Sequence, residues 1–331
     1  MRRSSLLDID DIETIDTPDA DRCGVVIGAP GGSPLQPAND NRPLSRQLDR
    51  LFTAALDIEA QAAQEAGALG FMARALVQAT MPHKAVVASE FERTNGAFTM
   101  TMVAPSKVGL PYGSIPRLII GFLTTEAVRT RDRHIVLGSS LSRFMAELDL
   151  APTGGRWGSI PRLKDQMTRL VSCSISCTYT AGNGIGIRNV TIADEANLWW
   201  EPRQPDQDTL WESTVILSER FFKEITENPV PIDLRALTAL KRSPMALDVY
   251  LWLTYRMSYV KGRTTIPWGA LQLQFGADYP ATAQGRRNFK KAFLHALAKV
   301  RLVYPALRLD DTAEALVLLP SVPHVMRRSV G

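Results

Sequence analysis

Two stretches of the chain predict the same succession of elements: helix, short strand, short helix, turn, long helix and hairpin. The first predicts helices at residues 115–130, 140–148 and 159–172 and strands at 135–137, 174–180 and 187–200, with an Asn-Gly turn joining the last two. The second predicts helices at 243–260, 268–275 and 282–300 and strands at 264–266, 306–309 and 315–319. This is the order of a winged helix-turn-helix, whose last helix enters the major groove of DNA.

The chain before these two stretches differs in composition. Residues 1–43 hold clusters of Pro, Gly, Asp and Asn without periodicity, which is typical of a disordered segment. Residues 44–78 predict one or two helices, and residues 84–105 predict a small hairpin. The expected fold class is α+β, mainly helical, with tandem winged helix-turn-helix domains. The expected division is a disordered acidic leader at 1–43, a helical and hairpin extension at 44–105, and winged-helix domains at 106–212 and 213–331.

The charge is distributed unevenly along the chain. The 331 residues have a formal net charge of +4. Residues 1–40 contain eight acidic and three basic residues, so the body that follows them is more basic than the total indicates. A basic body favours a polyanion partner, because Lys and Arg attract phosphates and release their counterions. An ordinary solvated surface of modest charge is the alternative.

Few residues of this sequence predict chemistry. The Gly-rich segment at 28–33 lacks the Gly-Lys-Ser/Thr ending of a phosphate loop. Cys173 and Cys177 have no second Cys/His pair nearby, so buried structural thiols are favoured over a zinc site. The four histidines of the chain show no metal-ligand spacing. We expect no enzyme activity, cofactor or metal. With three cysteines and no apolar run long enough for a bilayer, we expect a cytoplasmic protein that contacts no membrane.

The two long helices carry the candidate DNA-binding residues. Each has an apolar stripe for the core, which includes Leu163 and Met167 in the first and Phe289 and Phe293 in the second. The polar side chains elsewhere on these helices are of the types that pair with base edges or reach phosphates. In the first unit the candidates are Arg156, Ser159, Arg162, Gln166 and Arg169, with Arg188 on the wing. In the second they are Gln284, Arg286, Arg287, Asn288, Lys290 and Lys291, with Arg308 near the wing. A solvated helix surface is the alternative for each face.

Residues 111–325 resemble the plasmid-encoded RepA replication initiators. The resemblance rests on five strings: Pro-Tyr-Gly-Ser-Ile-Pro-Arg at 111–117, Leu-Thr-Thr-Glu-Ala at 123–127, Pro-Thr-Gly-Gly-Arg-Trp-Gly-Ser-Ile at 152–160, Pro-Ile-Asp-Leu-Arg-Ala-Leu at 231–237, and Ser-Pro-Met-Ala-Leu-Asp-Val-Tyr-Leu-Trp-Leu at 243–253. It implies a protein that binds repeated sequences, or iterons, in double-stranded DNA at a plasmid origin. It also implies origin opening, recruitment of a host helicase and host initiator, and exchange between homodimer and monomer.

The sequence therefore predicts a plasmid replication initiator that binds its origin through two winged-helix modules. A winged-helix transcriptional repressor is the first alternative, since the same modules serve both functions. A protein–protein module that binds no DNA is the second alternative.

Overall fold

The computed structural model describes residues 46–326 except 139, 156–157, 183, 200–202, 208–211 and 277. The predicted disordered leader and candidate Arg156 lie outside these residues. Leu44–Gly331 form one compact unit. The boundaries expected at 105/106 and 212/213 stay predictions.

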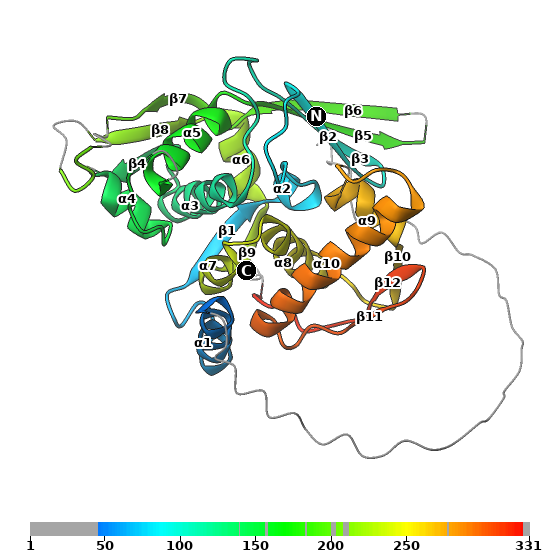
Figure 1. Cartoon of the computed structure of the whole chain (residues 1–331). Coiled ribbons are helices and arrows are strands. Elements are labelled where there is room, and N and C mark those ends of the chain that lie inside the picture. The colour runs from blue at the N-terminus through cyan, green and yellow to red at the C-terminus, as the bar shows by residue number, and fades with distance from the viewer. Residues whose placement is uncertain are drawn as a thin grey trace, which may run out of the picture. The chain divides into compact units, whose positions relative to one another are not determined.

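The first repeated stretch folds into three helices and a three-stranded antiparallel sheet at the left of Figure 1. We call it the first module; its members are α3 (Ser114–Thr130), β4 (His134–Gly138), α4 (Leu141–Glu147), α5 (Ser159–Val171), β7 (Ala193–Asn197) and β8 (Ser213–Leu217). Its strand order is β4–β8–β7. Ser140 caps α4 by accepting a hydrogen bond from the backbone N–H of Arg143. Pro116 lies in the first turn of α3, where its missing N–H leaves no hydrogen bond unmade.

The second repeated stretch has the same order of elements and the equivalent sheet order, β10–β12–β11. We call it the second module; its members are α8 (Pro244–Met257), β10 (Thr264–Pro267), α9 (Trp268–Phe275), α10 (Ala283–Val303), β11 (Leu309–Asp311) and β12 (Ala315–Leu318). Ser243 caps α8 and Thr282 caps α10, each accepting from a backbone N–H of the first turn. In both modules the strand that precedes the second helix pairs with the last strand of the sheet.

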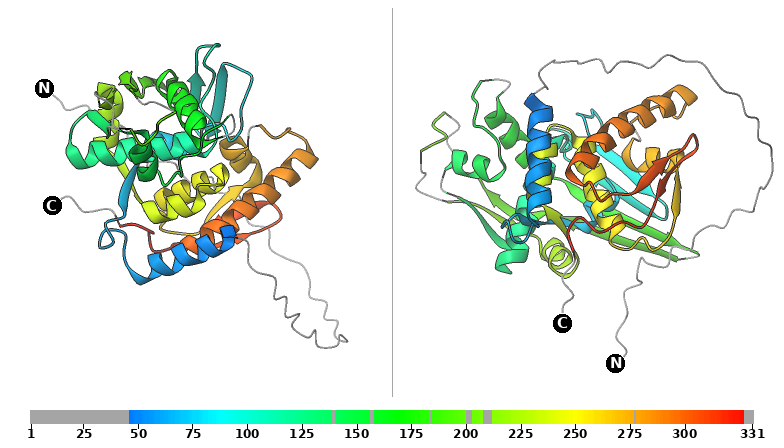
Figure 2. Two further views of the ribbon diagram at one scale, coloured as in Figure 1. Left: turned by 60° about the vertical axis from the view of Figure 1, so that its left-hand side comes forward. Right: turned by 90° about the horizontal axis from the view of Figure 1, so that it is seen from below.

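The remaining elements join the two modules. They are α1 (Arg46–Ala60), β1 (Leu69–Ala73), α2 (Arg74–Gln78), β2 (Glu90–Asn95), β3 (Phe98–Val103), β5 (Ser174–Ala181), β6 (Gly184–Thr191), α6 (Glu219–Glu227), β9 (Pro229–Asp233) and α7 (Leu234–Leu240). Helix α1 lies beside α10 and α7 (Figure 2), and β2 contacts α9. The hairpin expected within 84–105 is confirmed as β2–β3.

The hairpin expected to be the wing of the first module is not part of that module's sheet. Strand β5 pairs with β3, which gives the four-stranded order β2–β3–β5–β6. The pairing buries Met100 opposite Cys177 and Met102 opposite Ile175, so β5 is held by the apolar face of β3. The pair β7–β8 closes the first module instead, and the wing assignment of Arg188 is therefore wrong. Less than half of the described residues are helical, so the chain is α+β but not mainly helical.

Gly285 allows a close approach of the turn that leads into α10. A Cβ built on it would lie 1.9 Å from the carbonyl oxygen of Pro280, and one on Gly158, before α5, would lie 2.1 Å from that of Thr153. We expect Gly285→Ala to lower the free energy of unfolding by more than about 1 kcal/mol, because backbone has to move. Gly269→Ala, on α9 with nothing within 4 Å of its Cβ, is the matched control and is expected to be neutral or stabilising. Equal melting temperatures for the two variants would contradict the expectation.

Candidate nucleic-acid interface

Helix α10 separates an apolar face from a basic one. Phe289, Phe293, Leu297 and Val300 are at most 3% exposed, as the predicted core stripe requires. The sequence of α10 has six Lys or Arg residues and no Asp or Glu. Of the predicted DNA-binding side chains, Gln284, Arg286, Arg287, Asn288 and Lys291 are exposed, and Lys290 is half-buried. The N-terminal half of α10 therefore presents a positively charged surface.

Three of these side chains are joined by hydrogen bonds along one side of the helix. The Arg287 guanidinium donates to the amide oxygen of Gln284 from Nε at 3.2 Å and from Nη2 at 2.9 Å. The amide nitrogen of Gln284 donates in turn to Oδ1 of Asn288 at 2.8 Å. These bonds restrict side chains that would otherwise rotate freely. An Arg fork and two carboxamides held side by side match the donor and acceptor pattern of base edges in the major groove.

Lys290 has a different environment, although it lies on the same helix. Its ammonium is 4.6 Å from the centre of the Trp268 ring and donates to the carbonyl oxygen of Thr312, in the turn between β11 and β12. The indole N–H of Trp268 donates to the same oxygen at 3.0 Å. Lys290 therefore fastens α10 to the hairpin of its own sheet. The hairpin itself carries Asp310, Asp311 and Glu314, whereas Arg308 is exposed just before β11.

The structure corrects the predicted face of α5. Ser159 and Gln166 are 7% and 4% exposed, so neither is available on the surface. The Ser159 hydroxyl donates to the carbonyl oxygen of Ala151 at 2.6 Å, and Gln166 accepts from the backbone N–H of Tyr112 at 2.8 Å. Both side chains satisfy polar groups of neighbouring loops. The helical period cannot predict these two hydrogen bonds. Tyr112 is distant in the sequence from Gln166, and the Ala151 carbonyl has no sequence signal that marks it as an acceptor.

The two arginines of α5 are held to different degrees. Arg169 pairs with Asp165 at 2.9 Å, and its guanidinium lies 5.6 Å from the centre of the Tyr112 ring. Arg162 is exposed, with Nε donating to the carbonyl oxygen of Gly158 at 3.1 Å. Lys164 is a further exposed cation of α5 that sequence reasoning missed; its place outside the apolar stripe was the available signal. The exposed cations of α5 are thus Arg162 and Lys164, with Arg169 partly covered.

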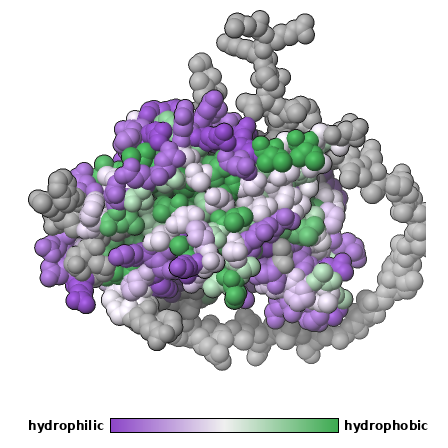
Figure 3. Space-filling view, turned by 90° about the horizontal axis from the view of Figure 1, so that it is seen from above, coloured by the Kyte–Doolittle hydropathy of each residue, from purple (hydrophilic) through white to green (hydrophobic). Residues whose placement is uncertain are grey.

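Arg188 is exposed on β6, at the edge of the four-stranded sheet. Its neighbours in the strand, Ile185 and Ile187, are 68% and 67% exposed. Figure 3 shows hydrophobic residues among hydrophilic ones on the upper face of the molecule. Because β6 belongs to the β2–β3–β5–β6 sheet and not to the β4–β8–β7 sheet, Arg188 is not on the sheet of the first module.

The described residues hold no group of three His, Cys, Asp or Glu side chains that could bind a metal ion. No helix among them has the length and apolarity to span a bilayer. Burial raises the pKa of Cys173 and of Cys177 to about 12, so both thiols are protonated at neutral pH. The prediction of packed thiols is consistent with this: Cys173 is buried and Cys177 half-buried.

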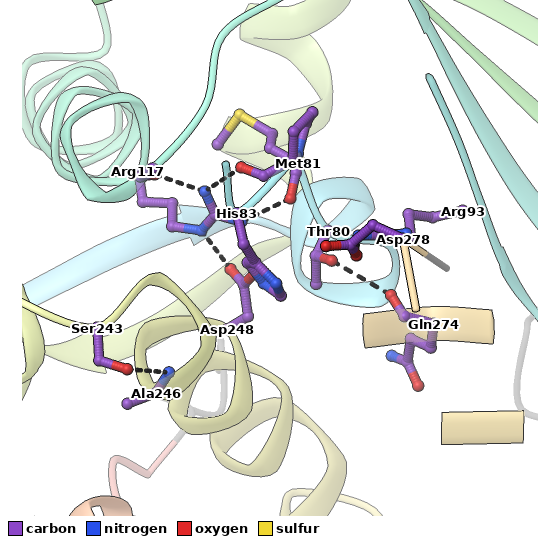
Figure 4. A network of polar contacts seen from close by, with 12 residues as sticks. Thr80, Met81, His83, Arg93, Arg117, Ser243, Ala246, Asp248, Gln274 and Asp278 are labelled. Atoms are coloured by element: carbon purple, nitrogen blue, oxygen red, sulfur yellow. Dashed lines mark hydrogen bonds and ion pairs between the residues drawn. The ribbon is translucent and has the colours of Figure 1, made fainter. Parts of the chain in front are cut away.

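A buried ion pair between the modules was also missed by sequence reasoning. Arg117 of α3 donates to both carboxylate oxygens of Asp248 on α8, from Nε and Nη2 at 2.6 Å each (Figure 4). Burial would raise the pKa of Asp248, but the charge of Arg117 and hydrogen bonds from His83 and Arg117 outweigh it, so the pKa lies below its ordinary value. The carboxylate is therefore ionised in the folded protein. The available signal was that each charge stands in an apolar run, at 115–120 and at 245–253, but the sequence does not show that the two charges meet.

His324 makes the stability of the second module depend on pH. Burial lowers the pKa of His324 to about 4, against an opposing effect of Asp233. The ring stacks on Tyr304, and Nδ1 lies 2.9 Å from the hydroxyl of Tyr250. The unfolded chain binds a proton near pH 6.5 and the folded chain does not, so stability is complete above about pH 6.5 and falls toward pH 4.

We expect the melting temperature of the wild type to fall steadily as the pH is lowered from 6.5 to 4. His324→Phe keeps the ring stack and removes the titrating group, so the fall should be shallower. Thermal unfolding followed by circular dichroism over this pH range measures both slopes. Identical slopes would place the acid sensitivity in other groups.

Comparison with known proteins identifies part of the chain. A family model described as plasmid encoded RepA protein matches residues 110–269, a range that runs from before α3 into α9 and leaves α10 outside. The chain is similar to a crystal structure of domains 2–3 of RctB, with a TM-score of 0.48 and 10% identity, over 75% of this chain and 96% of that chain. A selenomethionine derivative of the same RctB domains gives 0.49 and 10%, over 74% and 96%. No curated protein matches the chain.

The range matched by the family model includes Arg117 and Asp248 and all five strings on which the resemblance rested. The range covers the first module, the start of the second, and the elements β5, β6, α6, β9 and α7 that lie between them in the sequence. The predicted resemblance to the plasmid-encoded RepA proteins is therefore confirmed over residues 110–269.

Proposed function

We propose that the protein initiates plasmid replication by binding duplex DNA at the origin through two winged helix-turn-helix modules. The repeated sheet orders, β4–β8–β7 and β10–β12–β11, support this assignment, since each module closes its sheet in the same way around three helices. In this proposal α5 and α10 are the helices that enter successive major grooves, about 34–36 Å apart along the DNA. The family of residues 110–269 supports the role at a plasmid origin.

The basic face of α10 is the observation that carries the proposal. Solvated helix surfaces normally mix both signs of charge, whereas α10 has six cations and no acidic residue. Arg287, Gln284 and Asn288 would read base edges, and Arg286 and Lys291 would hold the phosphate backbone. Lys290 is left out because its ammonium is held by Trp268 and Thr312. In the first module Arg162 and Lys164 would make the corresponding contacts. Ser159 and Gln166 are left out because they are buried.

The remaining parts of the function rest on the family alone. We propose that the DNA-bound protein promotes opening of the origin and recruits a host helicase and host initiator. Exchange between a homodimer and a monomer would regulate these steps. The protein itself would supply binding energy and geometry and would act without a catalytic centre or cofactor.

Arg287→Ala tests the base contact directly. The probe is a set of duplexes recovered by the wild-type protein from a pool with a randomised central segment. We expect the substitution to weaken binding to the recovered sequence by about 1–3 kcal/mol and to relax the preference at one base position. Arg286→Ala should weaken binding to recovered and scrambled duplexes alike. It should also make the slope of log affinity against log salt concentration shallower by about one unit.

Lys299→Ala is the matched control, because Lys299 lies on the same helix but outside the N-terminal half. Its affinity and base preference should equal those of the wild type. A wild type that enriches no sequence would overturn the proposed function. If Arg287→Ala and Arg286→Ala bound as tightly and as selectively as Lys299→Ala and the wild type, α10 would not be part of the interface.

A further inference from the structure

We propose that buried polar contacts around residues 78–83 hold the two modules at one separation and orientation, and so determine the spacing of the DNA segments that they bind together. This inference rests on the proposed function and adds positioning residues to it. Residues 78–83 connect α2 to the loop before β2 and run between the modules, as the close view in Figure 4 shows. Three groups of contacts carry the argument.

The first group joins the opening helices of the two modules. Besides its two bonds to Asp248, Arg117 donates to the carbonyl oxygen of Met81 at 2.7 Å and to that of Pro82 at 3.3 Å. His83 lies 2.7 Å from Asp248 through Nε2. Arg117 and Asp248 are 1% and 3% exposed. The segment is thus attached to α3 and α8 through the same buried charge pair.

His83 is neutral in this environment. Burial lowers its pKa, and the attraction of Asp248 offsets this only in part. A neutral imidazole whose Nε2 carries the proton donates to the Asp248 carboxylate. The Asp248 carboxylate then accepts hydrogen bonds from Arg117 of α3 and from His83. Turning one module against the other would break these bonds together and expose a charge to an apolar interior, which is unfavourable.

The second group fixes the end of α9, which is followed by the turn into α10. The Thr80 hydroxyl donates to the carbonyl oxygen of Gln274 at 3.2 Å. The Gln274 amide donates back to the carbonyl oxygen of Gln78 at 2.9 Å, and Asn95 of β2 donates to that same oxygen at 3.0 Å. Thr80 and Gln274 are 1% and 3% exposed. The C-terminal end of α9 is therefore bound to the segment rather than packed against it by apolar contact alone.

The third group reaches the turn itself. Arg93 of β2 donates from Nη2 to Asp278 at 3.0 Å, and its side chain is fully buried. Burial lowers the pKa of Arg93, while Asp278 opposes the shift. Nε and Nη1 of Arg93 are buried without a hydrogen-bond partner, although the guanidinium lies 4.3 Å from the centre of the Phe91 ring. A charge kept in so incomplete a site adds little to stability, which favours a role in orienting the turn.

These contacts have a geometric consequence for DNA binding. Helix α5 packs on α3, and α10 continues from the turn that Arg93 holds. The positions of α5 and α10 relative to each other are then fixed through Arg117, Thr80 and Arg93. Two binding units in a rigid arrangement gain affinity from each other only when the spacing of their sites matches.

The experiment compares Arg93→Met/Thr80→Val with the wild type in the full chain. Both changes remove polar contacts at the module boundary while keeping side-chain size, and neither residue faces the proposed DNA-binding surface. Arg133→Met is the matched control, because it removes an ion pair with Asp194 inside the first module. Melting temperatures are measured first, and the single variant Arg93→Met replaces the double variant if the latter does not fold.

The probe is the duplex recovered by the wild type from the randomised pool, with its two enriched segments at the recovered spacing or moved apart by about 5 base pairs, half a helical turn. The wild type and Arg133→Met should lose about 100-fold in affinity on the altered spacing, as expected when one module can no longer engage. The double variant should lose less than about tenfold and should recover the same two segments at several spacings in a new selection.

Equal losses for the double variant and the wild type would overturn the inference, as would a wild type that binds both spacings equally well. A wild type that enriches no sequence would instead overturn the proposed function. The two failures are therefore distinguishable. A purely structural role would lower the melting temperature of the double variant without changing the recovered spacing.

Discussion

Asp248→Ala is expected to destabilise the protein by about 3–5 kcal/mol, because it leaves the buried Arg117 guanidinium without its anion. Arg117 is 1% exposed, and the backbone carbonyls that remain near it cannot neutralise its charge. Urea unfolding followed by circular dichroism measures the loss. The pKa of Asp248 is lowered, so the stabilisation is present above its ordinary value of 3.8 and is lost as the pH falls through the folded value.

The paired substitution Arg117→Met/Asp248→Leu is the control for this prediction. Removing both side chains leaves no unpaired charge, although the carbonyl oxygens of Met81 and Pro82 lose a donor. Part of the stability should therefore return, as is often found when apolar side chains replace a buried pair. His83 would lose its partner in both variants, and its effect therefore cancels in the comparison. If Asp248→Ala unfolded at the same urea concentration as the wild type, the pair would have no role in holding the modules.

Phe289→Ala is expected to cost about 3–5 kcal/mol through the core and not through DNA contacts. The ring is fully buried, and its centre lies 5.7 Å from that of Phe293 and 5.8 Å from that of Tyr279. The ring lies against Gly276, where any larger residue would clash, because a Cβ on Gly276 would lie 2.3 Å from the Phe289 ring. The cavity formed by truncation should loosen the turn before α10.

The measurement is a thermal melt without DNA, followed by binding at a temperature where the variant is folded. The melting temperature should fall sharply, and any loss of affinity should follow the unfolded fraction. Leu273→Ala on α9 is the control, because Leu273 is 55% exposed and should change stability little. An unchanged melt together with lost DNA binding would place Phe289 at the interface.

The parts of the fold that local patterns determine were predicted from the sequence. The hairpin predicted to close the first repeated stretch belongs to another sheet. The helices and first strands predicted for both stretches are confirmed, because they depend on patterns of neighbouring residues. The apolar stripes of α5 and α10 are confirmed for the same reason. The helical period alone places Leu163 and Phe289 in the core.

Pairings between distant segments were not predictable in this way. Strand β1 pairs with β9, which lies far along the chain. Strand β5 pairs with β3 and not with the sheet of the first module. Strands of five to eight residues have too little pattern to specify such partners. The burial of Gln166 has a similar origin. Its amide oxygen accepts a hydrogen bond from the backbone N–H of Tyr112, which lies in a loop distant in the sequence.

The charge of α10 runs against the direction that helix formation favours. The backbone dipoles place partial positive charge at the N-terminal end, where acidic side chains usually stabilise a helix. Here that end carries Arg286 and Arg287, and its first turn has no acid. The unbound chain thus keeps two cations beside the positive end of the helix, at a cost of some tenths of a kcal/mol that an approaching polyanion cancels. DNA binding and helix stability are therefore coupled at this terminus. The cations that would attract a phosphate also leave the positive end of the unbound helix without a compensating negative charge.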